Sequence, residues 1–170
     1  MQVQELKQIV IKVIDDMATD LIKVSRDIHA RPELAFEEFY AADRLCTMVE
    51  DNGLDITRNA FGLETAFVSS FGTQDEHDCE VAIISEYDAL PGIGHACGHN
   101  IIAAAGLGAT LALSKLNGKL PGRVRYLGTP AEEKGGGKEY MAQKGAFDGL
   151  DAAMMVHPAG VNLLTMPSLA

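Results

Sequence analysis

The sequence predicts a layered α/β domain, an αβα arrangement in which helices cover a largely parallel central sheet. The main indication is that apolar, strand-like runs alternate with helical stretches over residues 80–156. Two consecutive strand–helix–strand units imply parallel strands joined by right-handed crossovers. The second indication is size, because 170 residues are enough for one domain with a buried core.

The first third of the chain predicts two amphipathic helices. Apolar residues recur at spacings of three and four from about Gln4 to His29, which is typical of a helix with one buried stripe. A second helix is expected from about Glu37 to Asp51, because Asn52-Gly53 supplies residues that commonly end a helix. Two β-rich pieces follow, at Asp55–Asn59 and Thr65–Phe71.

The parallel part of the sheet is expected from the rest of the chain. Glu80–Ser85 is a mostly apolar run, as in a strand that is covered on both faces. A helix rich in Ala and Leu follows from about Gly98 to Leu116, and Arg123–Leu127 forms the next strand. A shorter helix from about Gly137 to Lys144 precedes the last strand, Ala152–Val156.

Charge and cysteine content argue against several classes of function. The chain has 24 acidic and 14 basic residues, for a net charge of −10. Nucleic acids and anionic membrane surfaces require clustered Lys and Arg, so neither is expected as a partner. No apolar run is long enough to span a bilayer, and the charged N-terminus lacks the apolar stretch of a signal peptide. Three cysteines are too few for a disulfide framework, so we expect a reducing, cytoplasmic location.

Candidate functional residues directly follow three of the predicted strands. In an open α/β sheet, ligands bind outside the carboxyl ends of the strands, so side chains that follow these strands are expected to meet. The candidates are Glu86, Asp88, His95, Cys97 and His99 after the first strand, Glu132 and Glu133 after the second, and His157 after the third. Thiolates, imidazoles and carboxylates bind divalent metal ions, so this edge of the sheet is the predicted metal site.

Cys97 and His99 lie two residues apart in a turn that opens a helix. Gly98 between them permits a tight backbone, and the helix N-terminus is expected to favour the Cys97 thiolate. The alternative is a buried cysteine beside a helix-capping histidine. The pair alone does not identify a metal site, because such sites combine more ligands.

The adjacent carboxylates of Glu132 and Glu133 suggest two different roles. Glu133 would bind metal, and Glu132 would act as general base on a metal-bound water, as paired carboxylates do in hydrolytic metal sites. The alternative is a solvated loop. His157 is either a further ligand or a histidine at the edge of the core, and Asp88 either orients a ligand or belongs to a turn. Glu86 is a weaker candidate.

Four segments carry a more specific signal: IHARPELAFEE (28–38), EYDALPGIGHACGHN (86–100), GTPAEEKGGGK (128–138) and MMVHP (154–158). Together they resemble the aminoacylase/carboxypeptidase family of dinuclear metallohydrolases. The resemblance is strongest to the branch that contains the indole-acetyl-amino-acid hydrolases, the aminobenzoyl-glutamate hydrolases and related dipeptidases. It implies a zinc-peptidase-like fold, two divalent metal ions (zinc or manganese), and hydrolysis of an amide or peptide bond in an N-acyl amino acid or dipeptide-like substrate.

The resemblance also implies a role for each matching residue. Glu132 is expected to activate a metal-bridging water, and Asp88 is expected to support it from the D-A-L-P turn. The implied metal ligands are Cys97, His99, Glu133 and His157. Many members of this branch have Asp where this chain has Asn100, as some dipeptidase-like members do, which favours a dipeptide without settling the substrate.

The second departure from the family is length. Members are longer, with an inserted lid and dimerisation domain and a later segment that supplies one more ligating His. Residues 1–170 are therefore expected to form the N-terminal part of the catalytic, metal-binding domain, and the full-length form is expected to be a homodimer. Two rival hypotheses remain: a non-catalytic metal-binding fragment, and a thiol hydrolase with Cys97 as nucleophile.

Overall fold

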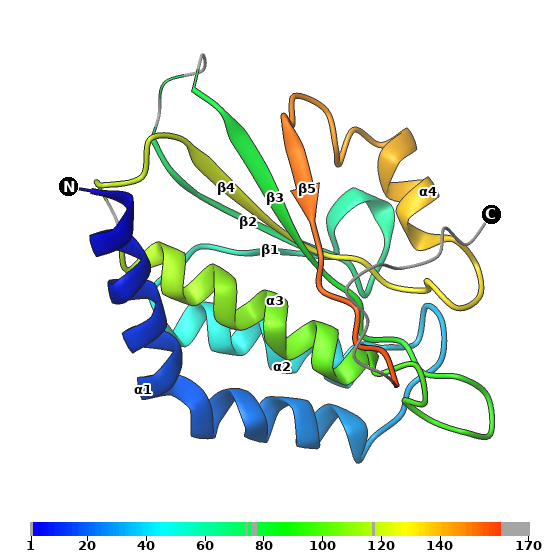
Figure 1. Cartoon of the computed structure of the whole chain (residues 1–170). Helices are drawn as coiled ribbons and strands as arrows, with labels where there is room; N and C mark the ends of the chain where they lie inside the picture. The colour runs from blue at the N-terminus through cyan, green and yellow to red at the C-terminus, as the bar shows by residue number, and fades with distance from the viewer. Residues whose placement is uncertain (1, 74, 76–77, 117, 161–170) are drawn as a thin grey trace.

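A five-stranded sheet organises the chain in a computed structural model that describes residues 2–73, 75, 78–116 and 118–160 (Figure 1). The strands are β1 (Thr57–Arg58), β2 (Phe67–Gly72), β3 (Glu80–Ser85), β4 (Arg123–Gly128) and β5 (Ala152–Met154), and their order across the sheet is β1-β2-β4-β3-β5. Strand β3 runs parallel to β4 and β5, which confirms the predicted strand–helix–strand units. Strands β1 and β2 add an antiparallel margin, so the sheet is mixed.

Four α-helices and one short 3-10 helix accompany the sheet. They are α1 (Val3–His29), α2 (Phe39–Asp51), η1 (Ala60–Gly62), α3 (His99–Ser114) and α4 (Gly137–Gln143). All four predicted α-helices are present, with ends that differ by at most two residues, which is the usual scatter at helix termini. No helix among the described residues is both long enough and apolar enough to cross a membrane.

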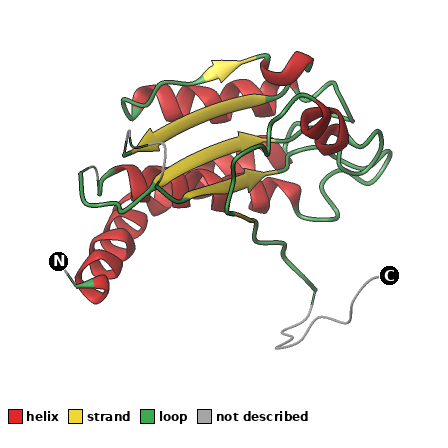
Figure 2. Ribbon diagram, turned by 90° about the horizontal axis from the view of Figure 1, so that it is seen from above, coloured by secondary structure: helices red, strands yellow, loops and turns green. Residues whose placement is uncertain are grey.

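Apolar side chains cover both faces of β3, as its sequence predicts. Helices α1, α2 and α3 pack on one face, where Ile83 and Tyr126 join their core (Figures 1 and 2). On the other face Ile84 packs with Met141 of α4 and Ala146. The alternation of Ile83 and Ile84 between two cores follows from the two-residue period of a strand. The structure is therefore layered in the predicted way.

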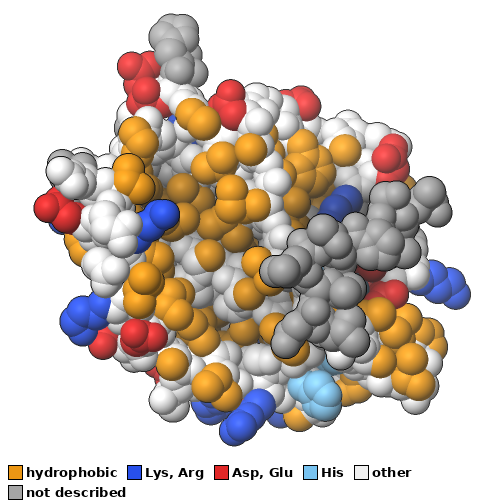
Figure 3. Space-filling view, viewed as in Figure 1, with side chains coloured by type: hydrophobic (Ala, Val, Ile, Leu, Met, Phe, Trp, Pro, Cys, Tyr) orange, Lys and Arg blue, Asp and Glu red, His pale blue; other side chains and the backbone are white. Residues whose placement is uncertain are grey.

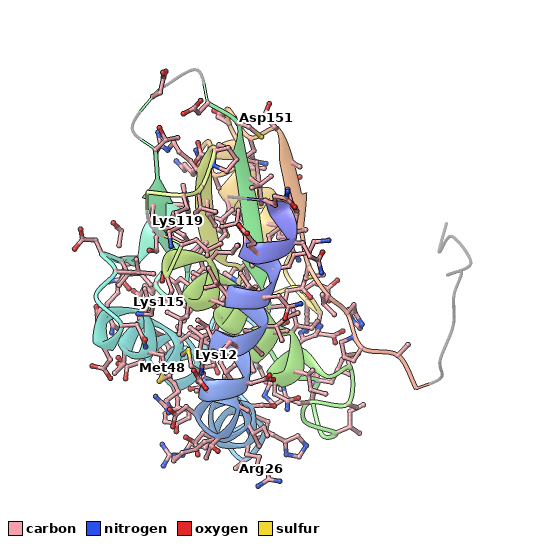
Figure 4. The ribbon with its side chains drawn as sticks, turned by 60° about the vertical axis from the view of Figure 1, so that its left-hand side comes forward. Lys12, Arg26, Met48, Lys115, Lys119 and Asp151 are labelled. Atoms are coloured by element: carbon pink, nitrogen blue, oxygen red, sulfur yellow. The ribbon has the colours of Figure 1, made fainter. Side chains whose placement is uncertain are left out.

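Helix α3 lies between the sheet and α1, and small residues let it approach both. A Cβ atom at Gly106 would lie 2.2 Å from the Ser85 Oγ, and one at Gly108 would lie 2.9 Å from Leu21 of α1. The outer side of α1 is charged, with exposed Lys12 and Arg26 along it (Figure 4). This packing fixes the position of His99, the first residue of α3, relative to the end of β3.

Strand β5 differs from the other parallel strands because it is an exposed edge. The beginning of β5 is held by Asp151, whose carboxylate accepts a 2.8 Å hydrogen bond from the Glu80 N–H (Figure 4). The chain leaves the ladder after Met154, two residues earlier than the sequence predicts. Hydrophobic side chains gather over the strands on the face shown in Figure 3, and Met154 itself is 56% exposed.

The three parallel strands end at one edge of the sheet. The segments that follow them, 86–98, 129–136 and 155–160, gather at the lower right of Figure 1. These segments carry the candidate residues, so the topology brings together side chains that are far apart in the sequence.

Candidate metal centre

His99 is the central residue of this edge. Its side chain is buried, and its Nδ1 lies 2.9 Å from Asp88 Oδ1. A carboxylate accepts hydrogen bonds, so Nδ1 carries the proton and the Nε2 lone pair points away from Asp88. Burial alone would lower the pKa of His99, but the hydrogen bond and charge of Asp88 outweigh it, and the pKa is raised. The ring is thus oriented as in a metal ligand.

Asp88 also holds the loop that follows β4. Its second oxygen, Oδ2, accepts a 2.8 Å hydrogen bond from the Glu133 N–H. Burial would raise the pKa of Asp88, but the hydrogen bonds from His99 and the Glu133 N–H outweigh it, so the pKa is lowered. Asp88 therefore connects the beginning of α3 to the Glu132-Glu133 loop. A role in its own turn alone, the alternative considered from the sequence, would not explain these two contacts.

Three carboxylates surround the free nitrogen of His99. The distances from His99 Nε2 are 3.4 Å to Glu86 Oε2, 3.7 Å to Glu132 Oε2 and 3.7 Å to Glu133 Oε1. His99 Nε2, Glu86 Oε2 and Glu133 Oε1 are all buried without a hydrogen-bond partner. Buried polar atoms without partners are rare, and two acidic oxygens directed at one imidazole nitrogen fit a cation between them.

His157 approaches the same point from the exposed segment after β5. Its ring lies edge-on to that of His99, with 5.9 Å between the ring centroids. The Pro158 carbonyl oxygen accepts a 2.8 Å hydrogen bond from the His157 Nδ1–H, which leaves Nε2 available as a ligand atom. Two groups of three possible ligands each offer atoms within 4.8 Å of one another: Glu86, His99 and His157, and His99, Glu132 and Glu133. Side chains that follow three different strands, His99, Glu133 and His157 among them, therefore lie close together at this edge.

Cys97 lies beside Glu133 but belongs to neither of these two groups. We expected the helix N-terminus to favour its thiolate, and this expectation is wrong for the structure described. The thiol donates a hydrogen bond to Glu133, and this carboxylate, with Glu132 and Asp88, raises the pKa of Cys97 to about 11. Negative charge from the carboxylates exceeds the effect of the helix terminus.

Gly98 allows the two approaching segments to touch. Its φ of +84° is in the left-handed region, and a Cβ atom there would lie 2.5 Å from Pro158 Cγ. The residue after His157 therefore packs directly against the turn between Cys97 and His99. The left-handed backbone at Gly98 is one that a side chain would disfavour, in agreement with the expectation that glycine is needed in this turn.

Sequence reasoning gave Glu86 too little weight. Its side chain is almost fully buried, and Lys138 donates to its Oε1 while Oε2 faces His99. The sequence did contain a signal, because Glu86 directly follows an apolar strand and begins the segment that carries Asp88 and His99. His95 lies on the other side of the turn, 6.3 Å from the His29 ring, and is absent from both ligand groups.

Asn100 contacts α1 and not the carboxylates. Its Nδ2 donates to Ser25 Oγ at 2.8 Å and to the Ser25 carbonyl at 3.3 Å. The residue that departs from the common pattern of the resembled branch therefore anchors α3 to α1.

A largely apolar cleft of about 490 Å³ opens beside Glu133. Its lining residues are Leu34, Ala35, Phe36, Glu37, Ala89, Leu90, Pro91, Glu133, Lys134 and Gly135. Leu34 and Phe36 are 42% and 37% exposed there. Apolar clefts of this size with a few convergent polar groups are typical of small-molecule sites.

Comparison with known proteins gives a consistent result. A family model described as "Peptidase family M20/M25/M40" matches residues 82–166, which is half of the chain. Over 99% of its length the chain is 39% identical to the Xaa-Arg dipeptidase of Mus musculus and covers 42% of that protein. It is 33% identical to one of the subunits of the p-aminobenzoyl-glutamate hydrolase of Escherichia coli (strain K12), over 91% of this chain and 36% of that one. The chain thus spans about two fifths of the length of these relatives.

Solved structures show the same fold. The YXEP protein of Bacillus subtilis, described as a dinuclear metal binding peptidase from the M20 family, gives a TM-score of 0.75 at 28% identity, over 82% of this chain and 42% of that one. Human carnosine dipeptidase 1 gives a TM-score of 0.66 at 14% identity, over 87% of this chain and 40% of that one, which is a likeness of fold alone. On these grounds the chain belongs to peptidase family M20/M25/M40.

Proposed function

We propose that the chain carries most of a dinuclear divalent metal site that hydrolyses an amide or peptide bond in an N-acyl amino acid or dipeptide-like molecule. The observation that supports this most directly is the convergence of His99 Nε2, Glu86 Oε2 and Glu133 Oε1, three buried atoms without hydrogen-bond partners. A cation between them would satisfy all three.

Cys97, His99, Glu133 and His157 are the proposed metal ligands, and Asp88 orients His99 and Glu133. Glu86, whose Oε1 accepts a hydrogen bond from Lys138, directs its Oε2 at the same ion. A thiol that coordinates a metal ion gives up its proton, so Cys97 would bind as a thiolate despite its raised pKa. A donor set of thiolate, imidazole and carboxylate suits zinc, and the surplus of carboxylates around it also suits manganese. Divalent ions bound here would polarise the scissile carbonyl and make water a better nucleophile at neutral pH.

Glu132 is the proposed proton carrier. Its side chain is 45% exposed, so it is accessible to substrate, while its Oε2 lies within 3.7 Å of His99 Nε2. It takes a proton from the attacking water and returns it to the leaving nitrogen. Glu133, whose side chain is 16% exposed and whose backbone is held by Asp88, is better placed for a fixed, ligating role.

The apolar cleft beside Glu133 is the proposed site for the acyl or side-chain group of the substrate. It shares Glu133 with the ligand set and is walled by Leu34, Phe36 and Leu90. An apolar group that is held there would keep its neighbouring carbonyl close to Glu132 and the ligands.

Four further expectations remain predictions. They are the assignment of residues 1–170 to the N-terminal part of a larger catalytic domain, the homodimer of the full-length form, the cytoplasmic location, and the absence of nucleic acid or membrane partners.

The proposal is tested by Glu132→Gln, with the exposed Glu64→Gln as matched control. We expect Glu132→Gln, made in the full-length form, to abolish hydrolysis of N-acyl amino acids and dipeptides while bound metal, measured by elemental analysis, stays unchanged. Near-normal turnover would refute the role of Glu132. A chain that binds metal but hydrolyses nothing even with Glu132 present would support the alternative, a non-catalytic metal-binding fragment. Activity that resists chelators and is lost on alkylation would instead favour Cys97 as nucleophile.

A further inference from the structure

Glu38 is a fully buried carboxylate that takes no part in the proposed chemistry. It stands at the beginning of α2, and the Thr65 hydroxyl donates a 2.9 Å hydrogen bond to its Oε2. Burial raises the pKa of Glu38, and hydrogen bonds from the backbone and Thr65 only partly offset this effect. Burying a carboxylate is unfavourable unless hydrogen bonds compensate the lost hydration, so the contacts of Glu38 need an explanation.

The other oxygen of Glu38 reaches the loop of the metal centre. Oε1 accepts a 2.8 Å hydrogen bond from the N–H of Ala131, which is 93 residues away in sequence and immediately precedes Glu132. Ala131 is completely buried, so without Glu38 its N–H would have no access to water.

Ala131 adopts a backbone conformation that side chains disfavour. Its φ is +59°, in the left-handed region that residues other than glycine rarely occupy. Its carbonyl accepts hydrogen bonds from the N–H groups of Gly136 and Gly137, at 3.0 and 3.2 Å. The peptide groups on both sides of Ala131 are therefore held, and Glu38 supplies the only one of these contacts that comes from a distant helix.

The loop is thus fixed at two points that flank Glu132. Glu38 holds the N–H of Ala131 on one side, and Asp88 holds the N–H of Glu133 on the other. The unusual φ at Ala131 sets the direction in which the next two side chains leave the backbone. We infer that Glu38 is a positioning residue, which keeps the carboxylates of Glu132 and Glu133 directed at His99. The inference rests on the proposed function for the roles of those carboxylates.

A carboxylate suits this position because it offers an acceptor to each side. Glutamine at position 38 keeps one acceptor for Ala131, and its amide can donate to the Thr65 oxygen, so Glu38→Gln should preserve the loop. Glu38→Ala removes both contacts, and Glu38→Asp withdraws the carboxylate by one methylene. Thr65→Val is the matched control, because it removes a hydrogen bond from the same buried group and leaves the bond to Ala131 in place.

The first measurement is hydrogen exchange at residues 131–133 in the protein without added metal. We expect protection to be lost in Glu38→Ala and Glu38→Asp and retained in Glu38→Gln and Thr65→Val. The second measurement is the binding of cobalt(II), followed by its absorption spectrum and by chelator competition. We expect affinity to fall by about 10- to 100-fold in the first two variants, with an altered spectrum, and to be restored in Glu38→Gln.

Unchanged exchange in both Glu38→Ala and Glu38→Asp would overturn the inference, as would a loss of metal affinity in Thr65→Val equal to that in Glu38→Asp. If Glu38→Ala does not fold, the comparison of Glu38→Asp with Glu38→Gln still tests whether Glu38 positions the loop. If the unmodified protein binds no metal, the proposed function fails, while the exchange measurement still tests whether Glu38 holds the loop.

Discussion

Replacing Gly98 by alanine should separate the geometry of the metal centre from the stability of the fold. Gly98 has a φ of +84° and lies against Pro158, the neighbour of the proposed ligand His157. Gly53 provides a matched control, because its φ is +83° and a Cβ atom there would meet nothing within 4 Å. The two substitutions impose the same backbone strain, and only one of them adds a steric contact.

The magnitudes can be worked out from this comparison. An L-residue in the left-handed region costs about 1–2 kcal/mol, and this cost applies to both Gly98→Ala and Gly53→Ala. At Gly98 the new Cβ atom would also lie 2.5 Å from Pro158 Cγ, so Pro158 must retreat by about 1 Å to reach normal contact. The segment after β5 is exposed, so it can move away without disturbing the core. His157 would move with it, and we expect metal affinity to fall by about 10- to 100-fold.

Two assays on both variants test this reasoning. Urea unfolding should give similar losses of stability for Gly98→Ala and Gly53→Ala, within the range above. Chelator competition should give weakened metal binding for Gly98→Ala and unchanged binding for Gly53→Ala. Equal metal affinities in the two variants would show that the contact of Gly98 with Pro158 does not hold His157 in place.

Two further predictions concern Glu38 and the apolar cleft. Because burial raises the pKa of Glu38 above its ordinary value of 4.5, the protein should lose stability relative to Glu38→Gln as pH rises from that value through the raised pKa. Urea unfolding across this range tests the sign, and a difference that does not change with pH would contradict it. Leu34→Asp should lower kcat/KM for substrates with apolar acyl groups by at least about 10-fold and leave metal content unchanged. Ile22→Asp, at an exposed position on α1, is the control. Equal effects of Leu34→Asp and Ile22→Asp on kcat/KM would show that the cleft does not bind the substrate.

The sequence predicted the elements of the fold better than their arrangement. Helical periodicity and apolar runs are local features, so they located every α-helix and the three parallel strands. Strand pairing is not local: β2 lies beside β4 and antiparallel to it, although β3 follows β2 along the chain. The extent of an edge strand also depends on its partner, and β5 pairs with β3 only over Ala152–Met154. That is why the predicted strand was two residues too long.

The candidate site could be predicted from one topological rule, and this rule also determines which of its residues the sequence could not reveal. The ends of parallel strands meet at one edge, so residues such as His99, Glu133 and His157 could be grouped without coordinates. Residues that reach this edge from other elements could not be assigned to it from the sequence. Glu38 comes from the start of α2, and Lys138 reaches Glu86 from α4. The raised pKa of Cys97 likewise depends on how closely Glu133 approaches it, which spacing along the chain does not reveal.

The buried and the exposed members of the proposed ligand set are held in different ways. His99 is fixed by Asp88, and the Glu133 backbone is fixed by the same carboxylate, so their unpartnered atoms face each other in the folded chain. A buried polar atom without a partner costs about 1–3 kcal/mol, and a bound cation would remove this cost from the arrangement that these contacts maintain. His157 has no comparable burial and is placed by the packing of Pro158 on Gly98. We therefore expect the contribution of His99 and Glu133 to metal affinity to depend on the stability of the fold. The contribution of His157 should depend on the exposed contact between Pro158 and Gly98.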